Sequence, residues 1–335
     1  MQTGKRNSAF ELLRIIAMTF IVIWHISYHA QKGELDSHNY ITAFCITGVN
    51  LFILISGYFG IKTSWKNLLT LVSTIAFYSI VTIALKWSIT DTPPDINSIK
   101  DLFAPLRESR WWFINCYFIL MLLSPIINLA LSKSTKQQYI YLLGTLLFIS
   151  CIQGFCFGNS INSNGYNTFQ FVTIYVLGDA INRFDIPARL SAKRLSIIYI
   201  SLVLSIFTSS FILMPKITFY NNPLVIASAV CLFCLISKIE FHNRTINQIA
   251  TFMLPIYLLQ DSVIGTMAYD YLYKKGLILD FQGFHYFATI GIYILALLGT
   301  ALVLDSIKRM TLRRPINAMS DFLNKKADIF GHLEQ

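Results

Sequence analysis

Ten long apolar segments, separated by short polar loops, constrain the fold of this sequence more than any other feature. A helix needs about 20 predominantly apolar residues to cross a bilayer, and the lipid offers no partners for unpaired backbone groups. Only 13% of the 335 residues are charged, against about 25% in soluble domains. The pattern predicts an all-α integral membrane protein, a bundle of about ten transmembrane helices. The segments are residues 9–30, 41–60, 67–89, 111–131, 138–157, 168–182, 195–214, 222–238, 245–266 and 286–307.

Basic residues are distributed unevenly between the two sides of this predicted bundle. If successive segments alternate in direction, eighteen lysines and arginines lie on the side of the two termini and seven on the other. Cytoplasmic loops of membrane proteins carry such an excess, so both termini are predicted to be cytoplasmic. The net charge of +10 comes largely from these short loops, and we therefore do not expect a nucleic-acid partner.

The sequence predicts one membrane domain, residues 1–310, followed by a cytoplasmic tail, residues 311–335. In the tail, apolar residues recur at helical spacing, which predicts a short amphipathic helix on the membrane surface. The first segment is too long for a cleavable signal peptide and is expected to remain. All six cysteines lie in apolar segments, and Cys231-x-x-Cys234 has no metal-binding context, so no metal site is expected.

The first apolar segment contains three ionisable residues, Glu11, Arg14 and His25. A charge at the centre of a bilayer costs roughly 3 kcal/mol or more, so such residues are usually functional. Eleven residues separate Arg14 from His25, which puts both on nearly the same helix face, about 16 Å apart along the axis. Glu11 can pair with Arg14 three residues later. The alternative is that Glu11 and Arg14 only flank the segment and His25 is interfacial, beside Trp24 and Tyr28.

Four motifs, taken together and in order, resemble the acyltransferase-3 family of integral-membrane bacterial enzymes. Arg14-x10-His25 lies in the context Phe-Glu-Leu-Leu-Arg-Ile-Ile-Ala, as in the first span of that family. Residues 48–59 contain Ser-Gly-Tyr-Phe and are similar to the family's Phe-Phe-x-x-Ser-Gly-Tyr stretch. Residues 111–128 are similar to its Trp-Phe…Tyr…Leu-Ser-Pro run, and residues 255–260 to its Tyr-Leu-Ile-His segment. The resemblance covers nearly the whole chain and implies a core of ten spans.

The resemblance implies that an acyl group, usually acetyl, is transferred to a cell-surface glycan. The donor would be cytoplasmic acyl-CoA, most often acetyl-CoA, with no tightly bound cofactor. Arg14 would bind the donor phosphates with Glu11 as its orienting partner, because arginine suits phosphate geometry. His25 would be the general base or would carry the acyl group covalently. Ser56, Gly57 and Tyr58 complete the expected donor site; alternatively, Ser56-Gly57 only allows close helix packing.

The acceptor is expected to bind on the outer side, where arginines and aromatic residues gather. Arginine pairs with phosphate and aromatic faces stack on sugars, but an aromatic belt with ordinary loop charges would give the same pattern. Many family members have histidine at the position of Gln260, so we assign no proton transfer to this residue. The expected acceptor residues are Arg107, Arg110, Trp111, Trp112, Tyr117, Tyr257, Gln260 and Asp261.

These observations predict a bacterial inner-membrane O-acyltransferase whose acceptor is a surface polysaccharide or its lipid-linked precursor, such as O-antigen or capsule. Family members with a fused extracytoplasmic domain are longer, so this chain is expected to act alone or with a separate extracytoplasmic protein. One alternative is a transporter or flippase for a lipid-linked sugar, although the sequence shows no paired repeats. A second alternative is an acyltransferase of the same family that transfers a succinyl group, or that acylates a small molecule instead of a glycan.

Overall fold

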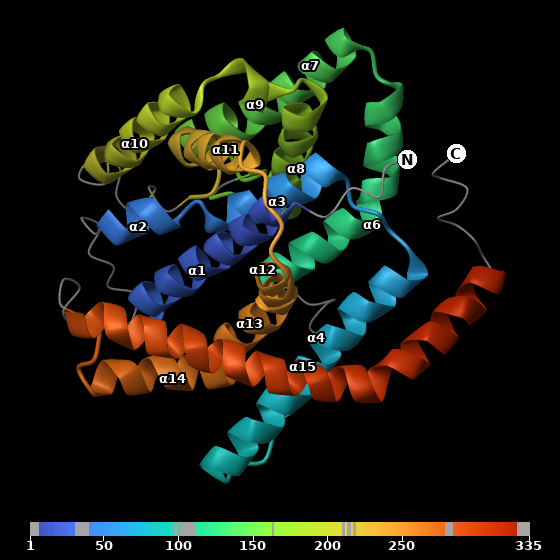
Figure 1. Ribbon diagram of the computed structural model, residues 1–335, viewed down its shortest axis with the longest axis vertical. Helices are drawn as coiled ribbons and strands as arrows, with labels where there is room; N and C mark the ends of the chain where they lie inside the picture. Colours follow the sequence, from blue (N-terminus) through green and yellow to red (C-terminus); the bar gives the residue numbers. More distant parts are fainter. Residues whose placement is uncertain are drawn as a thin grey trace. The chain divides into compact units, whose positions relative to one another are not determined.

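The computed structural model describes residues 7–30, 40–94, 96, 100, 111–162, 164–209, 212, 216, 219–278 and 284–326. Within these ranges the chain is helical and contains no β-strand, which confirms the predicted all-α class (Figure 1). Contacts divide the chain into two compact units. The first unit combines residues 1–28, 33–60 and 134–253, and the second combines residues 29–32, 61–133 and 254–335.

The first unit is built around α1 (Ser8–Ala30) and α3 (Gly48–Phe59). Helix α3 packs against α8 and α11, and α10 packs against α11 and α2. The other elements of this unit are α2 (Tyr40–Cys45), α7 (Lys136–Leu147), the π-helical segment η2 (Phe148–Cys156), α8 (Thr168–Arg183), α9 (Ile186–Arg189), α10 (Ala192–Ser209), α11 (Pro223–Ser237), α12 (Arg244–Ile249) and the 3-10 turn η4 (Ala250–Phe252).

The second unit is built on α4, which packs against α14 and α15. Helix α13 begins at the boundary between the units, and all of its residues after Met253 belong to the second. The helices of this unit are α4 (Trp65–Thr90), α6 (Trp112–Lys133), α13 (Met253–Gln260), α14 (Val263–Lys274) and α15 (Phe284–Lys326).

Six helices of the described chain are long and apolar enough to cross a membrane, or seven if the bent pair formed by residues 244–260 and 263–274 is one span. Two shorter apolar helices, Ala43–Phe59 and Pro223–Ser237, fall below the length of a full span. The protein is thus a multi-pass membrane protein by the length and composition of its helices. The count of about ten spans and the cytoplasmic position of both termini remain predictions.

Polar residues fix the N-termini of many helices. At each one a side-chain oxygen accepts a hydrogen bond from a backbone N–H two or three residues later, which satisfies a group that the helix leaves unpaired. Such a cap contributes about 1 kcal/mol. Thr135 and Gln138 form a reciprocal capping box at the start of α7. The other capping residues are Ser64, Asn167, Asn222, Asn243 and Ser262.

Glycines allow α3 and α8 to approach each other closely. A Cβ atom at Gly57 would lie 2.0 Å from the backbone oxygen of Tyr175, and one at Gly178 would lie 2.5 Å from the backbone oxygen of Leu54. No side chain fits at either position, so the two backbones touch, as in other membrane helix pairs with small residues at the interface. Gly57 therefore allows close helix packing, which the sequence analysis gave as the alternative to a role in the donor site.

A buried network of amides and hydroxyls joins the beginnings of α3, α8 and α11 to η2. The backbone oxygen of Tyr220 accepts hydrogen bonds from Asn50 and Gln170, both at 3.0 Å. The Gln170 side-chain oxygen accepts from Ser150 at 2.6 Å and from Asn162 at 3.0 Å. Because burial strengthens such bonds and penalises unpaired groups, the network holds these segments in one arrangement.

The chain bends most sharply after α13. The axis turns by 73° between residues 244–260 and 263–274. A proline inside a span, here Pro255, predicts a kink at its own position. The bend lies beyond it, where Ser262 caps α14 through the backbone N–H of Gly265. A Cβ atom at Gly265 would lie 2.0 Å from the backbone oxygen of Gln260, so this turn requires glycine. Helix α14 itself was not predicted.

Helix α15 continues without interruption from the last predicted span into the predicted tail. It runs from Phe284 to Lys326 and contains Pro315, and its ribbon changes direction toward its C-terminal part in Figure 1. Proline removes one backbone hydrogen bond and collides with the preceding turn, which accounts for the bend. The expected tail helix thus exists as an extension of the span rather than as a separate element. Residues 327–335 lie outside the described residues.

Candidate active site

The first turns of α1 carry an ion pair between Glu11 and Arg14. The distance between Arg14 Nη1 and Glu11 Oε1 is 2.5 Å. The carboxylate is buried, with 4% of its side chain exposed, whereas 29% of the Arg14 side chain is exposed. Glu11 therefore fixes one side of the guanidinium, while the arginine still reaches the surface of the first unit. This is the pairing that the three-residue spacing predicted.

Tyr58 lies beside the same end of α1. Its ring stacks on that of Phe10, with centroids 5.3 Å apart, and Phe233 of α11 packs against both rings. Phe10 precedes Glu11 in the sequence and lies one helical turn before Arg14, so the structure brings Tyr58 to the turn that carries the ion pair. The sequence analysis did not single out Phe10, although its four-residue spacing from Arg14 is a signal that could have done so.

Ser56 and Gly57 differ from Tyr58 in what they contact. The Ser56 hydroxyl donates to the backbone oxygen of Phe52 at 3.0 Å, within its own helix. Gly57 is buried against the backbone of α8. These contacts give both residues a packing role in α3, and their expected part in donor binding remains a prediction.

His25 is buried near the other end of α1, with 7% of the residue exposed. The Trp24 ring lies 5.4 Å from the imidazole and stacks on the Tyr28 ring at 5.0 Å with an interplanar angle of 8°. Tyr166, in the loop before α8, lies near Tyr28, and burial raises the pKa of its phenol, so the hydroxyl stays neutral. Its ring packs on that of Tyr220 at 4.7 Å. The buried histidine therefore packs beside Trp24, which is itself part of a stacked aromatic pair.

The second unit gathers several of the expected acceptor residues. Phe113 lies between them: its ring stacks on Tyr117 at 6.1 Å, meets Trp112 edge-on at 6.2 Å, and contacts Tyr257 of α13 at 5.4 Å. The Tyr257 hydroxyl donates to Asp261 Oδ2 at 2.9 Å. Four expected residues from α6 and from the end of α13 therefore form one aromatic cluster with a carboxylate. Phe113 is a residue that the sequence analysis missed.

The other expected acceptor residues are not among these ring contacts of the aromatic cluster. Gln260 is fully buried and accepts a hydrogen bond from the Tyr269 hydroxyl at 2.8 Å, which ties α13 to α14. Trp111 is buried, and its indole nitrogen has no hydrogen-bond partner among the described residues. Arg107 and Arg110 lie outside the described residues, so their contribution remains a prediction.

In the described ranges, no three histidine, cysteine, aspartate or glutamate side chains are grouped as metal ligands would be. Cys231 and Cys234 are free thiols, and Cys234 is buried.

Comparison with known proteins agrees with the arrangement of these helices and motifs. A family model described as an acyltransferase domain, that of the acyltransferase-3 family, matches residues 7–307. No curated protein and no solved structure matches the chain. The match covers both units, and it contains the buried ion pair, the buried histidine and the aromatic cluster. The chain therefore belongs to the acyltransferase-3 family and is a membrane acyltransferase.

Proposed function

We propose that this enzyme transfers an acyl group, most commonly acetyl, from cytoplasmic acyl-CoA to a hydroxyl of a surface polysaccharide or of its lipid-linked precursor. The acceptor class includes O-antigen and capsule, and the site of action is the bacterial inner membrane. The observation that carries this proposal is that α1 holds both an ion pair between the buried Glu11 and the partly exposed Arg14, and the buried His25. Ionisable groups within a membrane helix are costly and are kept where they act.

The donor side of the proposal rests on Arg14 and Tyr58. Coenzyme A carries several phosphate groups, and a guanidinium held by a buried carboxylate offers them N–H donors in a fixed orientation. Tyr58 lies near this turn through its stacking on Phe10. Along α1, Arg14 and His25 are about 16 Å apart, so an extended pantetheine arm running beside the helix would bring its thioester toward the histidine.

The chemical step needs one proton to move twice. A neutral imidazole of His25 takes the proton of the acceptor hydroxyl as the oxygen attacks the thioester carbonyl. The carbon–sulfur bond then breaks, and the leaving thiolate of coenzyme A takes the proton from the imidazolium. In the covalent variant, His25 first attacks the thioester, and the acceptor then receives the acyl group from the histidine. Both variants give an ester and free coenzyme A.

The acceptor side rests on the aromatic cluster of the second unit. Aromatic faces such as those of Trp112 and Tyr117 stack on the apolar faces of sugar rings, and Asp261, held by the buried Tyr257, accepts hydrogen bonds from sugar hydroxyls. Arg107 and Arg110 are proposed to pair with the phosphate of a lipid-linked acceptor. These roles agree with the composition of the cluster and support a glycan rather than an apolar acceptor.

Mass analysis of the surface glycan from host cells with and without this gene tests the proposal. The loss of one acyl mass per repeat on deletion, restored by the wild-type gene, supports it, and the size of the loss separates acetyl from succinyl. Loss of the glycan itself would favour transport of a lipid-linked sugar. An unchanged glycan, with an acylated small molecule missing from the cells, would contradict the proposed acceptor.

A further inference from the structure

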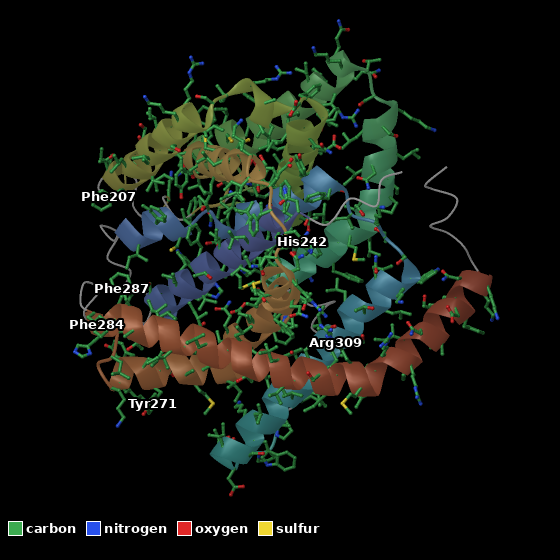
Figure 2. The ribbon with its side chains drawn as sticks, in the orientation of Figure 1. Phe207, His242, Tyr271, Phe284, Phe287 and Arg309 are labelled. Atoms are coloured by element: carbon green, nitrogen blue, oxygen red, sulfur yellow. The ribbon has the colours of Figure 1, made fainter. Side chains whose placement is uncertain are left out.

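A buried carboxylate holds two cationic side chains where α15 packs against α4. Asp305 Oδ2 accepts a hydrogen bond from Arg309 Nε at 2.6 Å, and Asp305 Oδ1 pairs with the ammonium group of Lys308. The spacing of three and four residues places all three side chains on one face of α15. Lys308 also donates to the hydroxyl of Thr74 on α4 at 3.2 Å. Figure 2 labels Arg309 where α15 passes α4.

This cluster carries more positive charge than a structural ion pair requires. One carboxylate neutralises one cation, so Asp305, Lys308 and Arg309 together have a net charge of +1. The side chain of Asp305 is 3% exposed and that of Lys308 12%, but that of Arg309 is 57% exposed. The surplus charge therefore reaches the surface on the arginine side.

A buried hydroxyl lies beside the cluster. Tyr78 follows Thr74 by one turn of α4, is fully buried, and is close enough to Asp305 and Arg309 to interact with both charges. Its hydroxyl has no hydrogen-bond partner in the part of the chain that the structure describes. Because a buried hydroxyl is costly when unpaired, this one indicates a partner other than the side chains that the structure describes.

The neighbouring sequence strengthens the positive field. Arg313 and Arg314 follow on α15 and are exposed, and the charge distribution predicts that this end of the helix is cytoplasmic. Basic residues immediately beyond a membrane span attract anionic headgroups. We propose that Lys308 and Arg309, oriented by Asp305 and joined by the Tyr78 hydroxyl, bind a phosphate group. Its source is either the headgroup of an anionic lipid or coenzyme A, and the second source rests on the proposed donor.

Binding measurements on the full-length enzyme in nanodiscs distinguish the two sources. In phosphatidylcholine discs, calorimetry measures the affinity for coenzyme A; in discs that also contain phosphatidylglycerol, native mass spectrometry counts the bound anionic lipid. Arg309→Gln should lower the binding affinity for coenzyme A, for the anionic lipid or for both about tenfold, as expected for loss of a charge-assisted hydrogen bond. The matched control is Arg194→Gln, which removes an exposed arginine at the start of α10 and should change neither.

Two further variants separate a phosphate site from a structural ion pair. Asp305→Asn keeps a side-chain oxygen that can accept a hydrogen bond from the cations, but it removes the negative charge that neutralises one of them. Phosphate binding should therefore tighten; a purely structural pair predicts a lower melting temperature with no gain in affinity. Tyr78→Phe removes only the unpaired hydroxyl, so binding should weaken while the melting temperature stays the same. This second variant keeps the test valid if Asp305→Asn fails to fold.

The outcomes assign the source or overturn the site. Weaker binding of only one probe by Arg309→Gln identifies that probe as the ligand, and weaker binding of both shows a shared phosphate site. If Arg309→Gln and Tyr78→Phe bind both probes like the Arg194→Gln control, the proposal is wrong. If the wild-type enzyme binds no coenzyme A at all, the proposed donor is wrong, and the lipid measurement still decides the site.

Discussion

Arg14 Nη1 lies 2.5 Å from Glu11 Oε1, and this ion pair joins a partly exposed arginine to a buried carboxylate on one helix. A carboxylate buried this deeply needs its cation. Glu11 in turn holds the Arg14 guanidinium at Nη1, so the other N–H groups of the guanidinium point in fixed directions. The proposed donor role requires Arg14 to be such an oriented anion receptor and not only an arginine that flanks the span, and this requirement leads to the first prediction.

Arg14→Lys should abolish most acyl transfer although it keeps the positive charge. Lysine can still pair with Glu11, so the protein should insert and melt like the wild type, but an ammonium group lacks the planar fork that binds phosphate at two points. Activity and coenzyme A affinity should be measured for Arg14→Lys and Arg14→Ala together. If both variants were near wild type in turnover, Arg14 would be only a residue that flanks the span.

The close contact of α3 and α8 predicts a stability effect at Gly178. Gly178→Ala places a Cβ atom 2.5 Å from the Leu54 backbone oxygen, so the helices must separate, at a cost of about 1–3 kcal/mol. The control is Gly144→Ala on α7, where a Cβ atom meets nothing within 4 Å. Alanine favours a helix there by roughly 0.5–1 kcal/mol over glycine. Melting temperatures in detergent should therefore fall for Gly178→Ala only; equal values would contradict the close packing.

The aromatic cluster predicts a specific loss of acceptor binding. Trp112→Ala should raise the KM for the acceptor about tenfold and leave coenzyme A affinity unchanged, because stacking on the sugar is lost while the proposed donor site is untouched. Trp87→Ala, which removes a half-exposed tryptophan from the end of α4, is the matched control for an aromatic belt. If the two variants behaved alike, Trp112 would be an interfacial anchor and not an acceptor contact.

The predicted orientation can be tested by cysteine labelling of intact cells. In a background without Cys156, which is exposed, Asn97→Cys should react with a membrane-impermeant reagent from outside, and Lys136→Cys should not. The reason is the excess of basic residues on the side of the termini. The opposite labelling pattern would reverse the side assigned to every proposed binding residue.

The sequence predicted the all-α fold class and the contacts between nearby residues of one helix well, because both depend on residue spacing along a helix. Glu11–Arg14 follows from three-residue spacing, and the approach at Gly57 follows from small residues in a span. Contacts between distant segments could not be predicted in this way. Phe113 joins Trp112 and Tyr117 to Tyr257 only after α6 and α13 have packed together.

Backbone geometry explains the other differences. Pro255 suggested a kink, but the sharp bend follows the capping of α14 by Ser262 and the glycine at position 265, which short-range pattern reading overlooked. Likewise, Pro315 bends α15 without ending it, since a proline inside a helix removes one hydrogen bond and the remaining turns keep theirs. The predicted tail helix therefore continues the last span.

The most direct test of the account is acyl transfer by His25→Gln. Glutamine fills a similar volume and can form hydrogen bonds, but it cannot take a proton from a hydroxyl or carry an acyl group in place of imidazole. The account predicts that the variant inserts, keeps its melting temperature and binds coenzyme A like the wild type, while acyl transfer to the glycan is lost. Substantial turnover by His25→Gln would contradict it, and His25 would then be a positioning residue.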